Sequence, residues 1–283
     1  MANEVVSIFT SVGFFYIRNH GVSDEDIEKF HKYTHTFFNL PENIKQKYLR
    51  DETNNGWSPL EREKVNMDRP ADLKESFNVT NIKEDIKVWP TEVPQFQGIM
   101  TKFFKMMASI SMRLLRLIAI GLKLEDPNYF HQFHCNVGGD NLSTMRSLRY
   151  PSLVGKEIKH NQIRCGEHTD FGTITVLFQD EIGGLEVLNK NDDYIPVGPI
   201  PGCAVVNIGD LMQKWTDNRL RATMHRVVPP SNDQMQSGER RSLAFFLYPD
   251  YSATIKSPLN DDDEPVNARE YSEMKFGQTY GYK

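Results

Sequence analysis

The first third of the chain places its apolar side chains mainly at helical spacing. Between Ser23 and Pro41 they recur every three or four residues, which predicts a helix that Ser23 caps and Pro41 ends. A longer stripe of the same kind fills residues 96–122 and predicts the longest helix, packed on a sheet. Residues 13–19 form a short aromatic run typical of a strand. Residues 51–95 are polar, hold four prolines and predict an irregular, loop-rich cover.

Beyond about residue 140 the pattern changes to short runs of β-branched and aromatic residues, separated by Gly, Pro, Asn and Asp. Such spacing is typical of a sandwich, a barrel or a jelly roll. The runs are 173–178, 184–188, 203–208, 224–228 and 242–248. No low-complexity linker follows the helical part, so we expect one mixed α/β (α+β) domain over residues 1–283. Its parts are a helical region at about 1–135, a β core at about 140–255 and a C-terminal segment at about 265–283.

The composition says little about the fold, but it excludes several kinds of binding partner. The 283 residues carry a net charge of −5 without a Lys/Arg cluster, which argues against nucleic acid as a partner. Three separated cysteines, Cys135, Cys165 and Cys203, give neither a disulfide framework nor a zinc pattern and suit a reducing compartment. Residues 5–17 are apolar but lack the basic flank of a signal peptide, and no window reaches the roughly 18 apolar residues of a membrane span. We therefore expect a cytoplasmic protein that does not act on a membrane.

His168-Thr169-Asp170 is the first candidate for a metal site. The three residues open the strand run at 173–178, and in an extended chain residues i and i+2 point to the same face. One imidazole and one carboxylate supply two ligands of a 2-His-1-carboxylate triad for Fe(II). The pair alone is weak evidence for a metal site, because a His-x-Asp sequence is expected by chance about 0.5 times in a chain of this composition. His225 begins another strand run and offers the third ligand, since strands that meet in a jelly roll are distant in sequence.

Arg240 and Ser242 are the candidates for binding a carboxylate. They enter the strand run at 242–248 on one face, and together they offer a bidentate guanidinium and a hydroxyl. Arg241 lies between them and points the other way, so it suits a surface salt bridge. A surface salt bridge is also the simpler interpretation of Arg240, because Arg-x-Ser by itself is near chance frequency.

These residues belong to a series of motifs that follow one another over about residues 11–250. The series is Gly13-Phe-Phe, Asn19-His-Gly21, Arg149-Tyr-Pro151, Gly166-Glu-His-Thr-Asp-Phe-Gly172, Ile174-Thr-Val-Leu-Phe-Gln-Asp180, Gly183-Gly-Leu185, Val206-Asn-Ile-Gly-Asp210, His225-Arg-Val-Val228 and Arg240-x-Ser242. In this order they resemble the isopenicillin N synthase-like family of 2-oxoglutarate/Fe(II)-dependent dioxygenases. The resemblance implies a double-stranded β-helix (jelly roll) core flanked by N-terminal helices.

The same resemblance implies a reaction and a set of site residues. A small organic molecule would be oxidised with O2, by hydroxylation, desaturation or a similar step, and the cosubstrate 2-oxoglutarate would leave as succinate and CO2. The implied site residues are His168, Asp170 and His225 for Fe(II), and Arg240, Ser242 and Tyr150 for a carboxylate of 2-oxoglutarate. Phe246 shares the strand face of Arg240 and is the candidate wall of the substrate pocket. Segments 51–80 and 265–283 are the candidates for a lid.

Two positions depart from the family's pattern. Relatives usually carry a strand some two dozen residues ahead of the Gly-Phe-Phe motif, but twelve residues precede Gly13 here, so we expect an altered sheet edge. Many relatives have Asn two residues before the motif's Tyr, where this chain has Leu148. We therefore expect one polar contact to the cosubstrate to be missing or replaced.

Two other functions would use the same scaffold. A ring-forming Fe(II) oxidase would keep the triad and Arg-x-Ser but use no 2-oxoglutarate, and succinate production separates the two activities. An inactive binding protein is expected to have lost a metal ligand, yet all three are present. His131-x-x-His134 also has spacing that suits a metal, but no carboxylate stands out beside it, so we expect ordinary helix-end residues. The substrate itself has no signature in the sequence.

Overall fold

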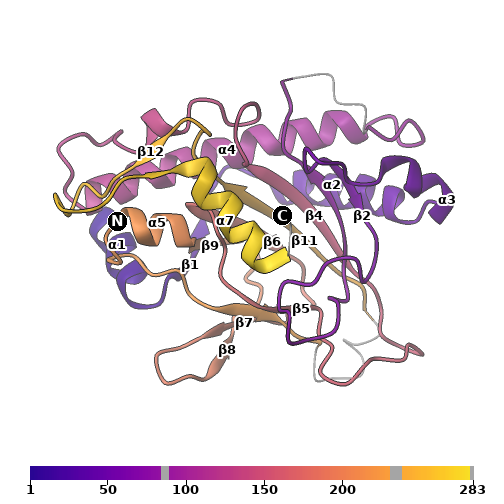
Figure 1. Cartoon of the computed structure of the whole chain (residues 1–283). Helices are drawn as coiled ribbons and strands as arrows, with labels where there is room; N and C mark the ends of the chain where they lie inside the picture. Colours follow the sequence, from indigo (N-terminus) through magenta and orange to yellow (C-terminus); the bar gives the residue numbers. More distant parts are fainter. Residues whose placement is uncertain (84–88, 230–237, 281–283) are drawn as a thin grey trace.

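A seven-stranded antiparallel sheet forms the centre of the computed structural model, which describes residues 1–83, 89–229 and 238–280 (Figure 1). Its strand order is β1-β9-β6-β11-β4-β3-β2, and a four-stranded antiparallel sheet of order β5-β10-β7-β8 packs against one face of it. The strands are β1 (Phe14–Arg18), β2 (Gly56–Ser58), β3 (Glu75–Val79), β4 (Thr144–Tyr150), β5 (Cys165–His168), β6 (Ile174–Gln179), β7 (Leu185–Leu188), β8 (Tyr194–Pro196), β9 (Cys203–Ile208), β10 (His225–Val227), β11 (Arg240–Leu247), β12 (Thr254–Ile255) and β13 (Val266–Asn267). We call the seven-stranded sheet the major sheet and the four-stranded sheet the minor sheet.

Helices cover the other face of the major sheet. They are α1 (Ala2–Ser11), α2 (Asp24–Phe38), α3 (Glu42–Lys45), α4 (Phe96–Gly121) and α5 (Asp210–Trp215), with 3-10 turns η1 (Gln46–Tyr48) and η2 (His131–Phe133). The C-terminal helix α7 (Ala268–Tyr280) lies apart from this layer. In Figure 1, α4 runs along the sheet as its longest covering helix, whereas α7 lies over the region between the two sheets. Among the described residues, no helix combines the length and the hydropathy that crossing a bilayer requires.

The side chains of β11 show how successive residues are divided between the two faces of the major sheet. Leu243, Phe245 and Leu247 belong to the large core beneath the helices, where the ring of Phe245 lies 5.1 Å from that of Phe104 on α4. Ala244 and Phe246 instead belong to the smaller cluster between the two sheets. Strand alternation therefore gives β11, and likewise β1, β4, β6 and β9, one face toward the helices and a second face toward the minor sheet.

The structure confirms the helices predicted behind Ser23 and over residues 96–122. The hydroxyl of Ser23 accepts a hydrogen bond from the Asp26 backbone N–H at 3.1 Å, and α2 ends at Phe38, ahead of Pro41. Residues 2–11, for which the pattern predicted no element, form α1 and bury one apolar face. β1 is one edge strand of the major sheet, and α1 precedes it in the chain; the comparison with the family's sheet edge stays a prediction.

The prediction of an irregular cover over residues 51–95 was wrong in part. Within it, β2 and β3 extend the major sheet beyond β4. The pattern hid β3 because all five of its residues are buried, polar ones included, so the usual alternation of apolar and polar residues is absent. Phe77 packs toward the helices, while Asn78, with no exposed surface, bonds to Arg146 on the other face.

Candidate active site

His168 and His225 meet where β5 and β10 pair in the minor sheet. They are direct register partners, and their ring centroids lie 4.2 Å apart. Asp170 follows two residues after β5 in the connection to β6, and its Oδ1 lies 3.8 Å from Nε2 of each histidine. Within the described residues, these three form the one group of metal-ligating side chains whose ligand atoms all lie within 4.8 Å of one another.

The local structure around this group differs from the prediction in one respect. His168 was expected to open the strand now called β6, but it ends β5, which belongs to the other sheet. The pairing of β5 with β10 contains an irregularity, since the three residues from His225 to Val227 on β10 lie opposite the four from Cys165 to His168 on β5. This bulge turns both Cys165 and His168 toward the cavity despite their odd spacing.

Hydrogen bonds leave the metal-facing atoms of the triad available. Nδ1 of His168 bonds to the Gly166 carbonyl at 2.8 Å and Nδ1 of His225 to the Thr223 carbonyl at 3.0 Å, so each Nε2 points to the centre. Asp170 Oδ2 accepts hydrogen bonds from two side chains that the sequence analysis quoted in motifs but gave no role. The donors are Thr175 Oγ1 at 2.6 Å and Asn207 Nδ2 at 2.7 Å.

Electrostatics keep His168 and Asp170 in the protonation states that a divalent metal binds. Burial and then the neighbouring His225 lower the pKa of His168 to about 3, so its imidazole is neutral. Burial raises the pKa of the Asp170 carboxyl, but the two histidines and the two hydrogen bonds outweigh it and hold that pKa below the usual range. A neutral imidazole at His168 and an ionised carboxylate at Asp170 fit the Fe(II) triad that the family resemblance implied.

The candidate carboxylate-binding residues gather at one end of the same cavity. Arg240 pairs with Tyr150 across β11 and β4, and its guanidinium carbon lies 4.7 Å from the Tyr150 ring centroid. Arg240 is 1% exposed, and it donates to Ser242 Oγ at 3.3 Å and to Gln179 Oε1 at 3.2 Å. The structure therefore brings Arg240, Ser242 and Tyr150 together and adds Gln179, which the sequence analysis did not single out.

Arg164 is a second buried guanidinium near this end, and it too was missed. Its Nη2 donates to the Gly238 carbonyl at 3.3 Å, whereas among the described residues its Nε and Nη1 have no hydrogen-bond partner, and neither has Nε of Arg240. Burial, and next the charge of Arg240, lower the pKa of Arg164 to about 10. Two buried guanidiniums with spare N–H groups favour an anion here. A single arginine outside any motif gave no signal in the sequence.

A cavity of about 790 Å³ connects these groups to solvent. Phe246 and Leu148 line it, so position 148 presents an apolar side chain to the cavity. Residues of both predicted lid segments line it as well, including Val65 and Phe276. The last three residues of segment 265–283 lie outside the described part of the chain.

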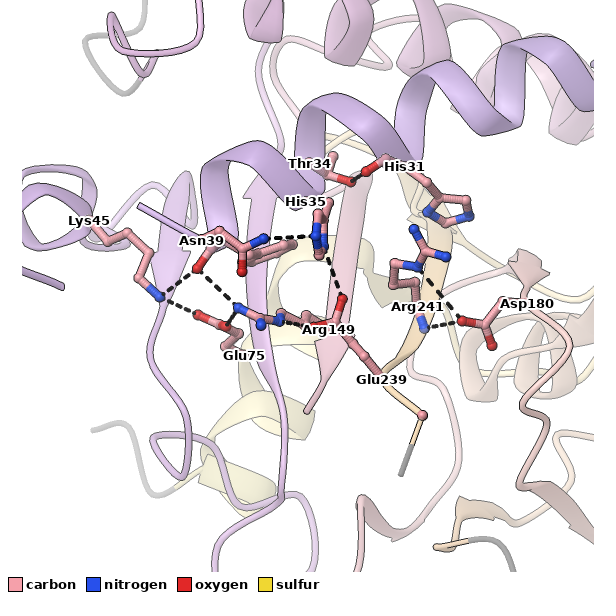
Figure 2. Close-up of polar contacts among 12 residues, drawn as sticks. His31, Thr34, His35, Asn39, Lys45, Glu75, Arg149, Asp180, Glu239 and Arg241 are labelled. Carbon is pink, nitrogen blue, oxygen red and sulfur yellow. Dashed lines mark hydrogen bonds and ion pairs between the residues drawn. The ribbon is translucent and has the colours of Figure 1, made fainter. Parts of the chain in front are cut away.

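Behind the cosubstrate residues, a polar network ties α2 to the outer faces of β4 and β11 (Figure 2). Glu239 accepts hydrogen bonds from Arg149 Nε and, at 3.2 Å, from His35 Nδ1. Arg241 points away from the cavity, as predicted, and its Nε lies 3.9 Å from Asp180. The network therefore fixes the neighbours in sequence of Tyr150 and Arg240 from outside the cavity.

The remaining histidine pair is structural, as expected. His131 Nε2 bonds to the Met112 carbonyl and His134 Nδ1 to the Phe130 carbonyl, each at 2.7 Å. Burial lowers the pKa of His134 to about 4, so this imidazole is neutral. Both side chains therefore bond to backbone carbonyls around η2, as helix-end residues do.

Comparison with known proteins identifies the family. The model of the 2OG-Fe(II) oxygenase superfamily matches residues 142–249, and a model described as non-haem dioxygenase in morphine synthesis N-terminal matches residues 1–96. The 2-oxoglutarate-Fe(II) type oxidoreductase ppzD of Metarhizium rileyi is 33% identical over 307 residues, which cover 98% of this chain and 85% of that protein. The chain belongs to the 2OG-Fe(II) oxygenase superfamily. This oxygenase is an oxidoreductase that uses Fe(II), 2-oxoglutarate and O2.

Further relatives agree with that assignment and confirm the jelly-roll fold. The oxygenase is 34% identical to the proline hydroxylase buaE of Petromyces alliaceus, covering 98% of this chain and 92% of that protein. The crystal structure of a full-length Neurospora crassa protein in complex with alpha-KG superposes with a TM-score of 0.88 at 32% identity. That match covers 99% of this chain and 90% of the Neurospora crassa chain.

Proposed function

We propose that two groups of residues carry the reaction of this oxygenase. His168, Asp170 and His225 bind Fe(II), and Arg240 with Ser242 binds the C5 carboxylate of 2-oxoglutarate, to which Tyr150 adds its hydroxyl. The observation that carries the first assignment is the common 3.8 Å distance from Asp170 Oδ1 to both Nε2 atoms. The second rests on a buried guanidinium with a spare N–H group in the same cavity.

Each protein group has a physical task in such a reaction. Bound Fe(II) supplies the redox chemistry with O2, and it leaves positions open because the chain provides three ligands. Thr175 and Asn207 hold Oδ2 of Asp170 and so aim Oδ1 at the metal. Arg240 fixes the far end of the cosubstrate, since a guanidinium and a carboxylate form paired, charge-assisted hydrogen bonds. The cosubstrate then leaves as succinate and CO2.

The substrate is a small organic molecule that enters the cavity of about 790 Å³. We propose Phe246 as one wall of its binding site, beside the guanidinium of Arg146, whose central carbon lies 5.8 Å from the ring centroid. Segments 51–80 and 265–283 form the lid, and residues 1–283 act as one domain. The cores on both faces of the major sheet support that proposal, because neither layer buries its apolar face without the sheet.

Anaerobic titration tests the site directly. Wild-type protein with Fe(II) and 2-oxoglutarate should show a visible metal-to-ligand charge-transfer band, which His225→Ala should lose. His160→Ala, which removes an exposed histidine, is the matched control and should keep the band. A band that survives in His225→Ala contradicts the ligand assignment. Substrate-dependent succinate release from a panel of metabolites then separates the dioxygenase from a ring-forming oxidase, which would release none.

A further inference from the structure

Lys74 and Cys165 touch across the two sheets, although neither belongs to the proposed metal or cosubstrate site. Lys74 immediately precedes β3 of the major sheet, and Cys165 begins β5 of the minor sheet. Lys74 Nζ lies 3.3 Å from Cys165 Sγ. Lys74 is 3% and Cys165 is 5% exposed, and both line the cavity that also holds His168. An amine and a thiol are thus in contact inside an oxygen-consuming cavity.

Two carboxylates hold this pair in place. Lys74 Nζ donates to Asp72 Oδ2 at 2.8 Å and lies 3.6 Å from Glu63 Oε2. Asp72 Oδ1 in turn accepts the Gly166 backbone N–H at 2.9 Å, which fixes the residue after Cys165 against the lysine. The bulge in β5 points the Cys165 side chain into the cavity. Residues next to β3 and residues of β5 therefore fix the contact from both sides. Asp72 can also accept a proton from the amine.

We infer that Lys74 and Cys165 form a covalent N–O–S bridge when O2 is consumed in the absence of substrate. The balance is one thiol, one ammonium and one O2 giving the S–O–NH bridge, one water and one proton. Sulfur and nitrogen each give up two electrons, and together these four electrons reduce O2. The inference takes its oxidant from the oxygenase activity and does not depend on which residues bind iron.

The surroundings direct oxidation to this cysteine. Burial raises the pKa of the Cys165 thiol to about 12, so it stays protonated and unreactive toward oxidants in bulk solvent. An oxidising species formed in the cavity reaches it without crossing solvent. Cys135 is exposed and bonds to backbone carbonyls, and in the described residues neither it nor Cys203 has a lysine as hydrogen-bond partner. These two cysteines therefore serve as internal controls.

The bridge would change both charge and connectivity. It replaces an ammonium by a weakly basic nitrogen near Tyr150, where the positive charge of Lys74 favours anion binding. It also links the two sheets covalently beside the metal site. Reduction by four equivalents of a thiol returns the thiol, the amine and water with two disulfides, so the modification is reversible. Idle turnover would thus lower the affinity for 2-oxoglutarate until a reductant restores the pair.

Peptide mass spectrometry tests this inference on the full chain. Protein incubated in air with Fe(II) and 2-oxoglutarate, but without substrate, should yield joined peptides containing Lys74 and Cys165. Their mass should exceed the sum of the separate peptides by one oxygen less two hydrogens, about 14 Da. Dithiothreitol should release them, and an anaerobic sample should lack them. Cys203→Ser should still form the bridge, whereas Cys165→Ser and Lys74→Arg should not.

The peptide masses distinguish a failure of this inference from a failure of the proposed function. A wild-type protein that forms the charge-transfer band and turns over, yet keeps a free Cys165 thiol, overturns the bridge alone. A Cys165 sulfinic acid beside an unmodified Lys74 overturns it too, because the amine then takes no part. The decisive measurement uses wild-type protein, so a variant that fails to fold leaves the test intact.

Discussion

His225 lies directly opposite His168 in the antiparallel pairing of β10 with β5, so a strand register sets the distance between the two rings. Outside the cavity, the residues next to them are joined by a side-chain ion pair, in which Arg226 Nη1 donates to Glu167 at 3.1 Å. A register is a collective property of many backbone hydrogen bonds and does not shift one residue at a time. The two imidazoles are therefore placed for a metal before a metal arrives.

Asn207→Ala should weaken iron binding without unfolding the protein. The amide of Asn207 holds Asp170 Oδ2 at 2.7 Å, and loss of such a supporting hydrogen bond typically costs about 10- to 100-fold in metal affinity. Fe(II) titration at saturating 2-oxoglutarate, followed by the charge-transfer band, measures the loss. Asn128→Ala, which removes an exposed amide, should bind iron like the wild type. Equal affinities for all three proteins would show that Asn207 does not position Asp170.

Arg240→Gln should raise the Kd for 2-oxoglutarate roughly 100-fold, about 3 kcal/mol, because it removes a buried charge-assisted pair with a carboxylate. The adjacent Arg241→Gln is the matched control, since that side chain faces Asp180 outside the cavity. Its Kd should stay within about twofold of the wild type. Anaerobic titration with 2-oxoglutarate compares the three proteins. A similar loss in both variants would mean that net charge, rather than a direct contact, controls binding.

The stability of the protein should fall as the pH drops from about 6.5 to about 4. His134 has an ordinary pKa of 6.5 when unfolded, but burial lowers its pKa to about 4 in the folded protein. In that window the unfolded state binds more protons, so acid favours unfolding by up to about 1.4 kcal/mol per pH unit. Burial and then Arg241 lower the pKa of His31 to about 4 as well, which steepens the slope.

Urea unfolding at several pH values measures that dependence. His134→Gln should reduce the change in the free energy of unfolding between pH 6.5 and pH 4, because the variant lacks this titrating group. The His31 contribution should remain in the variant. A slope that equals that of the wild type would show that His134 is not held neutral by the fold.

Phe276→Ala should loosen the coupling between cosubstrate and substrate oxidation. The ring of Phe276 lines the cavity and lies 5.4 Å from the ring of Phe171. Its loss opens the cavity to water and should raise KM for the substrate about 10-fold. The amount of succinate formed per product should rise as well. Met274→Ala, on the exposed side of α7, should leave both quantities unchanged. Unchanged coupling in Phe276→Ala would argue against α7 as a lid.

The sequence predicted those parts of the fold and site that depend on local patterns. The α4 stripe and the β11 alternation are local, so both could be recognised from spacing. The triad and Arg240-x-Ser242 followed from motif order, and the structure brings each group together in one cavity. Extended geometry alone placed Arg240 and Ser242 on one face, as observed.

The missed features all depend on partners far along the chain. Glu75 in β3 is buried because Lys45 and Arg149 neutralise it, and neither partner is near it in sequence. Asn207 could not be assigned a role until β9 paired with β6 beside Asp170. The contact between Lys74 and Cys165 joins residues 91 positions apart and exists only because two sheets stack. No pattern of hydrophobicity encodes such contacts.

The two halves of the proposed active site belong to different layers of the protein. His168 and His225 sit on the minor sheet, whereas Arg240 and Tyr150 sit on the major sheet. If the proposed residues bind iron and cosubstrate, the span that 2-oxoglutarate bridges is the thickness of the layer between them, to which apolar side chains such as Leu185 belong. Substitutions in that layer would change the distance between the two sheets. They would alter the fit between iron and cosubstrate without touching either, so selection on catalysis extends to residues that otherwise serve only packing.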